Sequence, residues 1–292
     1  MARNVFVIGG WDRFHAVSED GSDWKDIEFE EDDRQFCTGI AFGAGQCGML
    51  WKRGYHGDSY LTISSNGSTW DETKLETDEP GHSLAWYDGK FIVCTGKTIN
   101  RGHKPKTYLT EDGKKWSKAH EVGGQSIMTH YVEGNERLLG IGPDGMAATT
   151  TNGADWKVAE LASQDSMVSL AFGNGAFVGG GLHGKIMRSE DGLKWDQVNT
   201  GREGDHINSM IWDGTKFIGV GMESTFASTD GKSWESVPNE NPPLNAVMGA
   251  NGLFLGCQWK ARLMGSEDGV TWNEGHVFER HIEIIAYGSL ES

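Results

Sequence analysis

Three short segments of this chain place a tryptophan within a few residues of an arginine: Trp11-Asp12-Arg13, Trp51-Lys52-Arg53 and Trp259-Lys260-Ala261-Arg262. The face of an indole stacks on sugar rings and on other aromatic groups, and a guanidinium can bind a carboxylate through two parallel hydrogen bonds. If the three segments lie together, they form a candidate binding surface for a glycan or a protein, with these ligand-binding residues: Trp11, Arg13, Trp51, Arg53, Trp259 and Arg262.

A second interpretation of these residues stays open at the level of sequence. The tryptophans could fill space between adjacent loops while the arginines pair with acidic segments such as Glu30–Asp33. A long basic segment, Lys97–Lys106, carries Arg101, His103 and Lys104 and would add to the same region.

The histidines and cysteines do not have the spacing of a metal site. Four histidines precede or lie in predicted inner strands: His82, His130, His206 and His281. No two of them lie in one element at the spacing expected of metal ligands. The cysteines lie in or beside apolar runs, with no C-x-x-C pair, and are expected to be small core residues; they are Cys37, Cys47, Cys94 and Cys257. We therefore expect no metal and no cofactor.

The elements that must position all these residues follow from a repeat. One motif recurs seven times: a serine or threonine, any residue, an aspartate or asparagine, a glycine, any two residues and a tryptophan. The tryptophans of successive copies are 46, 46, 40, 39, 39 and 38 residues apart. A period of about 40 residues indicates stacked or ring-arranged structural units. The copies are Ser18–Trp24, Ser64–Trp70, Thr110–Trp116, Thr150–Trp156, Ser189–Trp195, Ser228–Trp234 and Ser266–Trp272.

Each repeat contains short apolar or alternating runs bounded by glycine turns, which are typical of antiparallel hairpins. In one repeat these runs are Met167–Phe172, Ala176–Gly180 and Lys185–Arg188, and the segment after the tryptophan supplies a fourth strand. Four-stranded units at this period predict an all-β, seven-bladed β-propeller that occupies residues 1–292 as a single domain. The first repeat starts at its second strand, Asn4–Gly9, so Ile282–Gly288 is expected to supply its inner strand and to close the ring.

Each residue of the repeat has a structural explanation. The side-chain oxygen of Asp or Asn accepts backbone N–H groups across a tight turn, glycine allows a positive φ, and the tryptophan packs between blades. Asn replaces Asp in two copies, so a catalytic or metal-binding role common to all seven is not expected. The residues concerned are Asp20, Trp24, Asn66, Trp70, Asp112, Trp116, Asn152, Trp156, Asp191, Trp195, Asp230, Trp234, Asp268 and Trp272.

The repeat resembles the Asp-box, or bacterial neuraminidase (BNR) repeat, of sialidases, photosystem assembly factors, sorting-receptor propellers and many bacterial and phage proteins. The usual box, S-x-D-x-G-x-T-W, is one residue longer than the form here, as in Ser18-Glu19-Asp20-Gly21-Ser22-Asp23-Trp24. The shorter form is similar to repeats of phage tail and appendage proteins and of bacterial propellers. The resemblance implies that the box is a structural turn on the rim, remote from any active site.

The resemblance does not carry over a sialidase mechanism. That chemistry needs an activated aryl nucleophile and a separate acid, whereas Tyr131 and Tyr287 fall in predicted inner strands where aromatic side chains pack between blades. The arginine motif that precedes the boxes of sialidases is absent, and sialidases have six blades.

We expect a non-enzymatic structural or protein-interaction module, such as a virion or tail appendage or an assembly component. The alternative is a carbohydrate-binding propeller, with glycosidase activity as a minor variant.

The charge and hydropathy of the chain limit its partners. With 26 basic and 42 acidic side chains the net charge is -16, which disfavours nucleic acid and anionic membranes. No apolar run approaches the roughly 18 residues that span a bilayer, and no export signal precedes the first strand. We expect a cytoplasmic or virion protein whose partner is another protein or a glycan.

Overall fold

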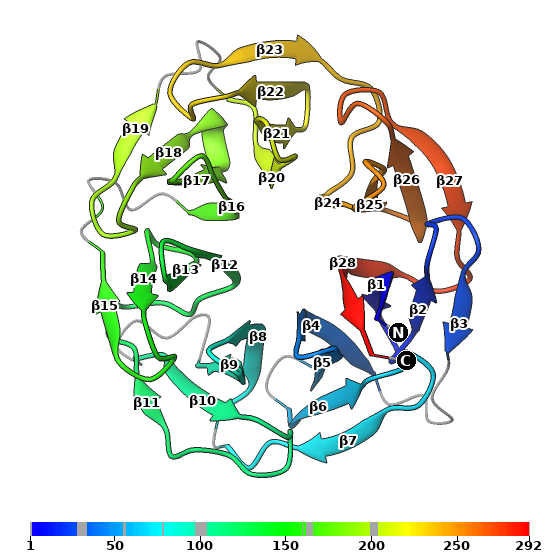
Figure 1. Ribbon diagram of the computed structural model, residues 1–292, viewed down its shortest axis with the longest axis vertical. Coiled ribbons are helices and arrows are strands. Elements are labelled where there is room, and N and C mark those ends of the chain that lie inside the picture. Colours follow the sequence, from blue (N-terminus) through cyan, green and yellow to red (C-terminus); the bar gives the residue numbers. More distant parts are fainter. Residues whose placement is uncertain are drawn as a thin grey trace.

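The computed structural model describes residues 2–27, 34–54, 57–77, 79–96, 104–159, 161, 166–198 and 204–291. Its strands form seven four-stranded antiparallel sheets around a central axis, and a single 3-10 turn, η1 (Leu182–Gly184), accompanies them. The chain is therefore a seven-bladed β-propeller, as the repeat predicts (Figure 1). No helix in the part of the chain described is long and apolar enough to cross a membrane.

The blades are numbered in chain order, and their strands are given from the axis outward. Blade 1 contains β28 (Ile282–Leu290), β1 (Arg3–Gly10), β2 (His15–Ser18) and β3 (Lys25–Ile27). Blade 2 contains β4 (Gln35–Gly43), β5 (Gln46–Arg53), β6 (Ser59–Ser64) and β7 (Asp71–Lys74). Blade 3 contains β8 (Gly81–Tyr87), β9 (Lys90–Thr95), β10 (Lys106–Thr110) and β11 (His120–Glu121). Blade 4 contains β12 (His130–Gly134), β13 (Arg137–Ile141), β14 (Ala147–Thr150) and β15 (Trp156–Val158).

The remaining three blades have the same order. Blade 5 contains β16 (Met167–Gly173), β17 (Ala176–Gly181), β18 (Ile186–Ser189) and β19 (Asp196–Val198). Blade 6 contains β20 (Ile207–Trp212), β21 (Phe217–Gly221), β22 (Ser224–Ser228) and β23 (Glu235–Pro238). Blade 7 contains β24 (Asn245–Met248), β25 (Phe254–Gln258), β26 (Arg262–Ser266) and β27 (Asn273–Val277).

The ring is closed by the C-terminal strand, as predicted. Strand β28 pairs antiparallel with β1, from Arg3 opposite Leu290 to Gly10 opposite Ile282. Figure 1 shows the two chain ends side by side in blade 1. Because β28 is the inner strand of that blade, closure pairs an edge that β1 would otherwise expose.

The repeated turn has the hydrogen bonds expected of it. In blade 5, Asp191 Oδ1 accepts the backbone N–H groups of Leu193 and Lys194, both at 2.8 Å. In blade 2, Asn66 Oδ1 accepts the corresponding two N–H groups at 2.9 Å, so the amide makes the same turn without a charge. The seven glycines that follow have φ between 69° and 83°, a region that glycine adopts with little strain.

The seven tryptophans of the repeats pack between blades. Each lies in an apolar cluster formed by its own blade and the preceding one, at a different junction of the ring. In blade 5, for example, Trp195 is buried with Phe177 of its own blade and Leu139 of blade 4. These side chains therefore hold neighbouring blades together. All four cysteines are free and buried in the same core, as expected.

The direction of the strands divides the loops between two faces. The repeated turns and the inner hairpins lie on one face, which we call the box face. The loops from the second to the third strand, and those from the outer strand to the next blade, lie on the opposite face, which we call the loop face. A contact across blade 1 confirms this division, because the N–H of Trp11, after β1, donates to the carbonyl of His281, before β28, at 3.0 Å.

Candidate functional site

Two of the three predicted tryptophans meet on the loop face. Trp11 follows β1 and Trp259 follows β25, and each is followed by two residues with left-handed backbone, Asp12-Arg13 and Lys260-Ala261. The turns present the two indoles to solvent, 50% and 64% exposed. His281 lies between them: its ring meets Trp11 edge-on at a centroid distance of 5.4 Å and stacks with Trp259 at 6.1 Å.

The carboxylate of Glu283, which the sequence analysis does not identify, lies next to these rings. Glu283 Oε1 accepts the indole N–H of Trp11 at 2.7 Å and lies 4.0 Å from Nε2 of His281. His281 and Glu283 are two residues apart on extended chain, so both side chains point to the same side while Ile282 between them enters the core. We call Trp11, Trp259, His281 and Glu283 the ring-and-carboxylate site.

A pocket of about 280 Å³ opens beside this site. Trp259, His281 and Glu283 contribute to its wall, together with Leu244, Asn245 and Gln258 at the start and end of strands in blade 7. The amide of Asn245 donates to the carbonyl of Glu283, and the amide of Gln258 donates to the carbonyl of Pro242 at 3.0 Å. The polar wall is therefore held in place by the backbone of β28 and of the loop between blades 6 and 7.

The expectation for Trp51 was wrong. Its side chain is fully buried, and its indole N–H donates to Thr62 Oγ1 at 2.9 Å. Strand β5 continues to Arg53, so Trp51-Lys52-Arg53 is the end of a strand and not a loop. Trp51 points to the same side of β5 as Cys47 and Met49 and packs with them between blades 1 and 2.

The predicted arginines do not converge on one anion. Arg13 is buried and hydrogen-bonds Glu72 of blade 2, and Arg262 hydrogen-bonds Gln258 and lies 3.4 Å from a carboxylate oxygen of Glu274. Arg53 is exposed at the end of β5. These pairings agree with the alternative in which the arginines bind acidic groups of their own and neighbouring blades. Glu30–Asp33, Arg101 and His103 lie outside the described residues, and Lys104 lies 3.3 Å from Glu121.

The exposed apolar side chains are concentrated on one sector of the loop face. Among the described residues, large apolar side chains are exposed at seven positions, and each lies in a loop of that face or within one residue of a strand end that reaches it. Six belong to blades 6, 7 and 1 or to the loop between blades 6 and 7; the seventh lies in blade 4. They are Trp11, Met222, Val237, Leu244, Trp259, Val277 and, in blade 4, Val158.

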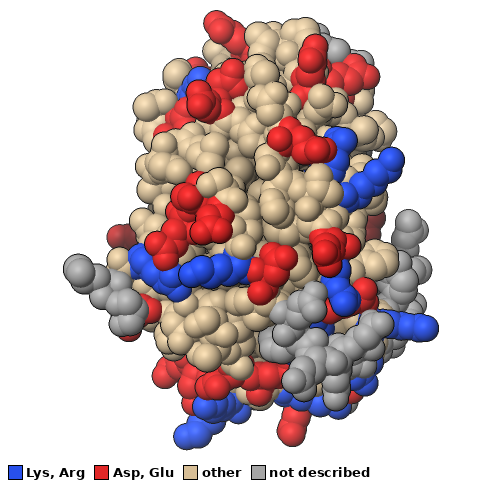
Figure 2. Space-filling model, turned by 90° about the vertical axis from the view of Figure 1, so that its right-hand side faces the viewer, with Lys and Arg blue, Asp and Glu red and all other residues tan. Residues whose placement is uncertain are grey.

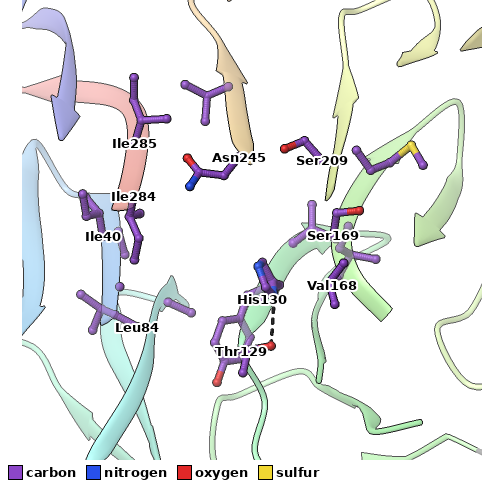
Figure 3. Close-up of a pocket in the computed structure, with 18 of the residues that line it drawn as sticks. Ile40, Leu84, Thr129, His130, Val168, Ser169, Ser209, Asn245, Ile284 and Ile285 are labelled. Carbon is purple, nitrogen blue, oxygen red and sulfur yellow. Dashed lines mark hydrogen bonds between the residues drawn. The ribbon is translucent and has the colours of Figure 1, made fainter. Parts of the chain in front are cut away.

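The central channel is a second cavity, of about 430 Å³, lined by all seven inner strands. Figure 3 shows hydroxyl and amide groups of Ser169, Ser209 and Asn245 around it, among aliphatic side chains. His130 faces this space and lies 3.0 Å from Thr129 Oγ1. Desolvation by the channel wall lowers the pKa of His130.

Two of the other predicted histidines contact backbone groups. Nε2 of His82 contacts the carbonyl of Gly96 at 2.9 Å, and Nδ1 of His206 accepts the N–H of His183 at 3.0 Å. Within the described ranges, no group of three or more His, Cys, Asp or Glu side chains is arranged to hold a metal ion.

Acidic side chains are spread over one side of the molecule. Figure 2, which views the side formed by blades 7 and 1, shows carboxylates spread over that surface with lysine and arginine in a few places between them. This distribution agrees with the net charge of -16.

Comparison with known proteins shows similarity of fold. No protein-family model and no curated protein matches the sequence. Many solved structures resemble the chain, and three of them illustrate the similarity.

"YCF48 bound to D1 peptide" matches with a TM-score of 0.61 and 17% identity, over 82% of this chain and 80% of that one. The WD40 β-propeller domain of Doa1 matches with a TM-score of 0.59 and 10% identity, over 91% and 87%. The computationally designed Ika8 protein matches with a TM-score of 0.63 and 14% identity, over 96% and 84%.

Proposed function

We propose that this propeller is a non-enzymatic interaction module that binds another protein through the loop face of blades 6, 7 and 1. The observation that carries the proposal is the concentration of exposed apolar side chains in that sector. Exposed apolar groups that cluster within a polar surface mark interaction sites, and tryptophan is enriched among the residues that dominate binding energy. Trp11 and Trp259 are therefore the expected anchors.

The fold comparisons are compatible with this function. One similar structure is described as bound to a peptide, and a propeller presents the loops of consecutive blades side by side. We also propose that the seven repeats are a shortened Asp-box, since Asp or Asn, glycine and tryptophan take the turn and packing roles of that motif. A virion appendage or an assembly complex is the setting that we propose on this resemblance.

The two tyrosines considered for glycosidase chemistry have packing roles, which supports a non-enzymatic function. Tyr131 packs between blades 3 and 4, and its hydroxyl lies 3.0 Å from Ser83 Oγ. Burial raises the pKa of Tyr131 well above its usual value, which opposes formation of a nucleophilic phenolate. Tyr287 packs on Phe6 with ring centroids 4.7 Å apart.

A glycan is the second candidate partner, and one observation favours it. The exposed indole of Trp259 lies beside a pocket whose wall includes the carboxylate of Glu283 and the amides of Asn245 and Gln258. An aromatic ring with nearby carboxylate and amide groups is the combination that stacks on a sugar and hydrogen-bonds its hydroxyl groups.

The test compares capture of partners by immobilised wild-type protein and by a Trp11→Ala/Trp259→Ala double variant. The matched control is Val158→Ser, which changes an exposed apolar side chain on the same face in blade 4. We expect a specific protein partner to be lost with the double variant and retained by the control. The proposal fails if capture is unchanged by the double variant, or if the control loses the partner equally. A glycan array with the same three proteins tests the second candidate.

A further inference from the structure

The ring-and-carboxylate site contains a negative charge that is not paired with a lysine or arginine among the described residues. Glu283 Oε1 accepts from Trp11, and no hydrogen bond from the described part of the chain reaches Oε2. Nε2 of His281 lies 4.0 Å from the same Oε1. The carboxylate is only partly buried, with 33% of the side chain exposed, so a group that enters from solvent can reach it.

The arginines of this region are already engaged with other carboxylates. Arg13 pairs with Glu72, Arg262 lies 3.4 Å from Glu274, and Arg280 lies 3.8 Å from Asp12. These three arginines thus pair with carboxylates other than Glu283, while Glu283 lies beside the exposed indole of Trp11.

One buried cation lies within electrostatic range of Glu283. Burial lowers the pKa of Lys52, and the charge of Glu283 opposes that shift. The ammonium of Lys52 is directed elsewhere, however, since it lies 3.4 Å from Nδ1 of His82 and 5.0 Å from the centroid of the Phe36 ring. Glu283 therefore remains available to a second cation at the surface.

The rings around this carboxylate suit a flat cation. Trp259 stacks on His281 with an angle of 27° between the planes, and 64% of its surface remains exposed for another group. A guanidinium stacks on an indole face and also donates two parallel hydrogen bonds to a carboxylate, which an ammonium does not do. Lysine would keep the charge but lose both the stacking and the bidentate geometry.

The size of the pocket and the charge of the molecule agree with this ligand. The pocket measures about 280 Å³, which is large enough to hold a single side chain. The net charge of -16 attracts basic segments over long distances and raises their rate of association.

We infer that the ring-and-carboxylate site binds an arginine side chain of the partner protein, with Trp259 stacked on the guanidinium and Glu283 accepting its hydrogen bonds. This inference rests on the proposed protein-binding function and names the chemistry that the partner must present: an arginine on an exposed, basic segment.

The experiment uses the full chain labelled with 5-fluorotryptophan and follows its ¹⁹F NMR spectrum. Trp11→Phe and Trp259→Phe variants assign the two resonances. The probe is N-acetylarginine amide at millimolar concentrations, and N-acetylcitrulline amide, a neutral molecule of nearly the same shape, is the comparison. We expect the arginine probe to shift the Trp11 and Trp259 resonances with an affinity roughly fivefold higher than that of the citrulline probe.

Glu283→Gln removes the charge with little change in shape and should weaken the arginine probe roughly two- to fivefold. Glu121→Gln is the matched control, because Glu121 is an exposed carboxylate in blade 3; this variant should behave as wild type. The unshifted resonances of the other tryptophans report that each variant is folded.

Three results would overturn the inference: equal binding of citrulline, an unchanged affinity in Glu283→Gln, or shifts produced by a methyl glycoside in preference to arginine. If the arginine probe fails while partner capture still needs Trp11 and Trp259, the inference fails and the protein-binding function stands. If the probe binds as expected but partner capture does not depend on these tryptophans, the protein-binding function fails instead.

Discussion

Removal of strand β28 is expected to open the ring and to abolish the native fold. A chain that ends before His281 lacks the inner strand of blade 1 and leaves β1 without its partner along Arg3–Gly10. It also lacks three almost fully buried side chains, which are Ile282, Ile285 and Leu290.

The size of this loss follows from burial. Truncation of a buried isoleucine or leucine to alanine typically destabilises a protein by about 2–5 kcal/mol. Three such losses amount to about 6–15 kcal/mol if they are additive, and the whole free energy of unfolding of an ordinary domain is about 5–15 kcal/mol. The deletion therefore removes an amount comparable to the entire stability. Leu290→Ala alone should cost about 2–5 kcal/mol and leave the protein folded.

The assay is chemical and thermal unfolding followed by circular dichroism, with limited proteolysis as a second measure of folding. A chain that ends at Leu290 keeps the whole of β28 and is the control. Addition of a synthetic peptide of residues 281–292 should restore protection to the deleted chain. A deleted chain that unfolds cooperatively at the wild-type midpoint would show that β28 is dispensable and that closure does not hold the ring.

Three further predictions concern single side chains. Asp191→Ala should lower the free energy of unfolding by about 1–2 kcal/mol, because two backbone N–H groups lose their acceptor, whereas Asp191→Asn should cost less; urea unfolding of both variants checks this order. Hydrogen bonds from the N–H groups of Ser233 and Lys232 lower the pKa of Asp230 from 3.8 to about 2. Its stabilising contribution is therefore complete above about pH 5 and is lost as the pH falls towards 2. Asp230→Asn should therefore lose less stability than wild type between pH 4.5 and 2.5, and an equal loss in urea unfolding would contradict this. Trp51→Ala should cost about 3–5 kcal/mol and Trp259→Ala less than about 0.5 kcal/mol; similar midpoints for the two variants would refute the assignment of one indole to the core and the other to the surface.

The fold could be predicted because its determinants are local and repeated. The repeated turn needs an Asx side chain, a glycine with positive φ and a tryptophan four residues after the Asx. This requirement leaves a visible pattern in each blade. Closure was predictable for the same reason, since a missing inner strand at one end matched an extra strand at the other. The packing of each repeated tryptophan against the preceding blade also follows from its fixed position in that pattern.

The site was only partly predictable, because it depends on where strands end and which loops meet. Trp51 was misplaced although a signal was present: Cys47, Met49 and Trp51 alternate along one side of β5, which indicates a strand that continues into the core. The pairing of Trp11 with Glu283 joins residues 272 positions apart and left no local pattern. The same is true of Arg13 and Glu72, since a pairing between blades is set by loop geometry.

The pairing of β1 with β28 also determines the order of events during synthesis. Phe6 and its partner Tyr287 are 281 residues apart in the chain, so Phe6 is synthesised well before Tyr287. At about 5–20 residues per second, β1 waits on the order of 15–60 s for its neighbour. Contacts between such distant parts of a chain form slowly, because a very long loop must close first. An unfinished propeller thus exposes an unpaired strand edge during this interval, and a chaperone that covers the edge of β1 would protect the nascent chain from aggregation.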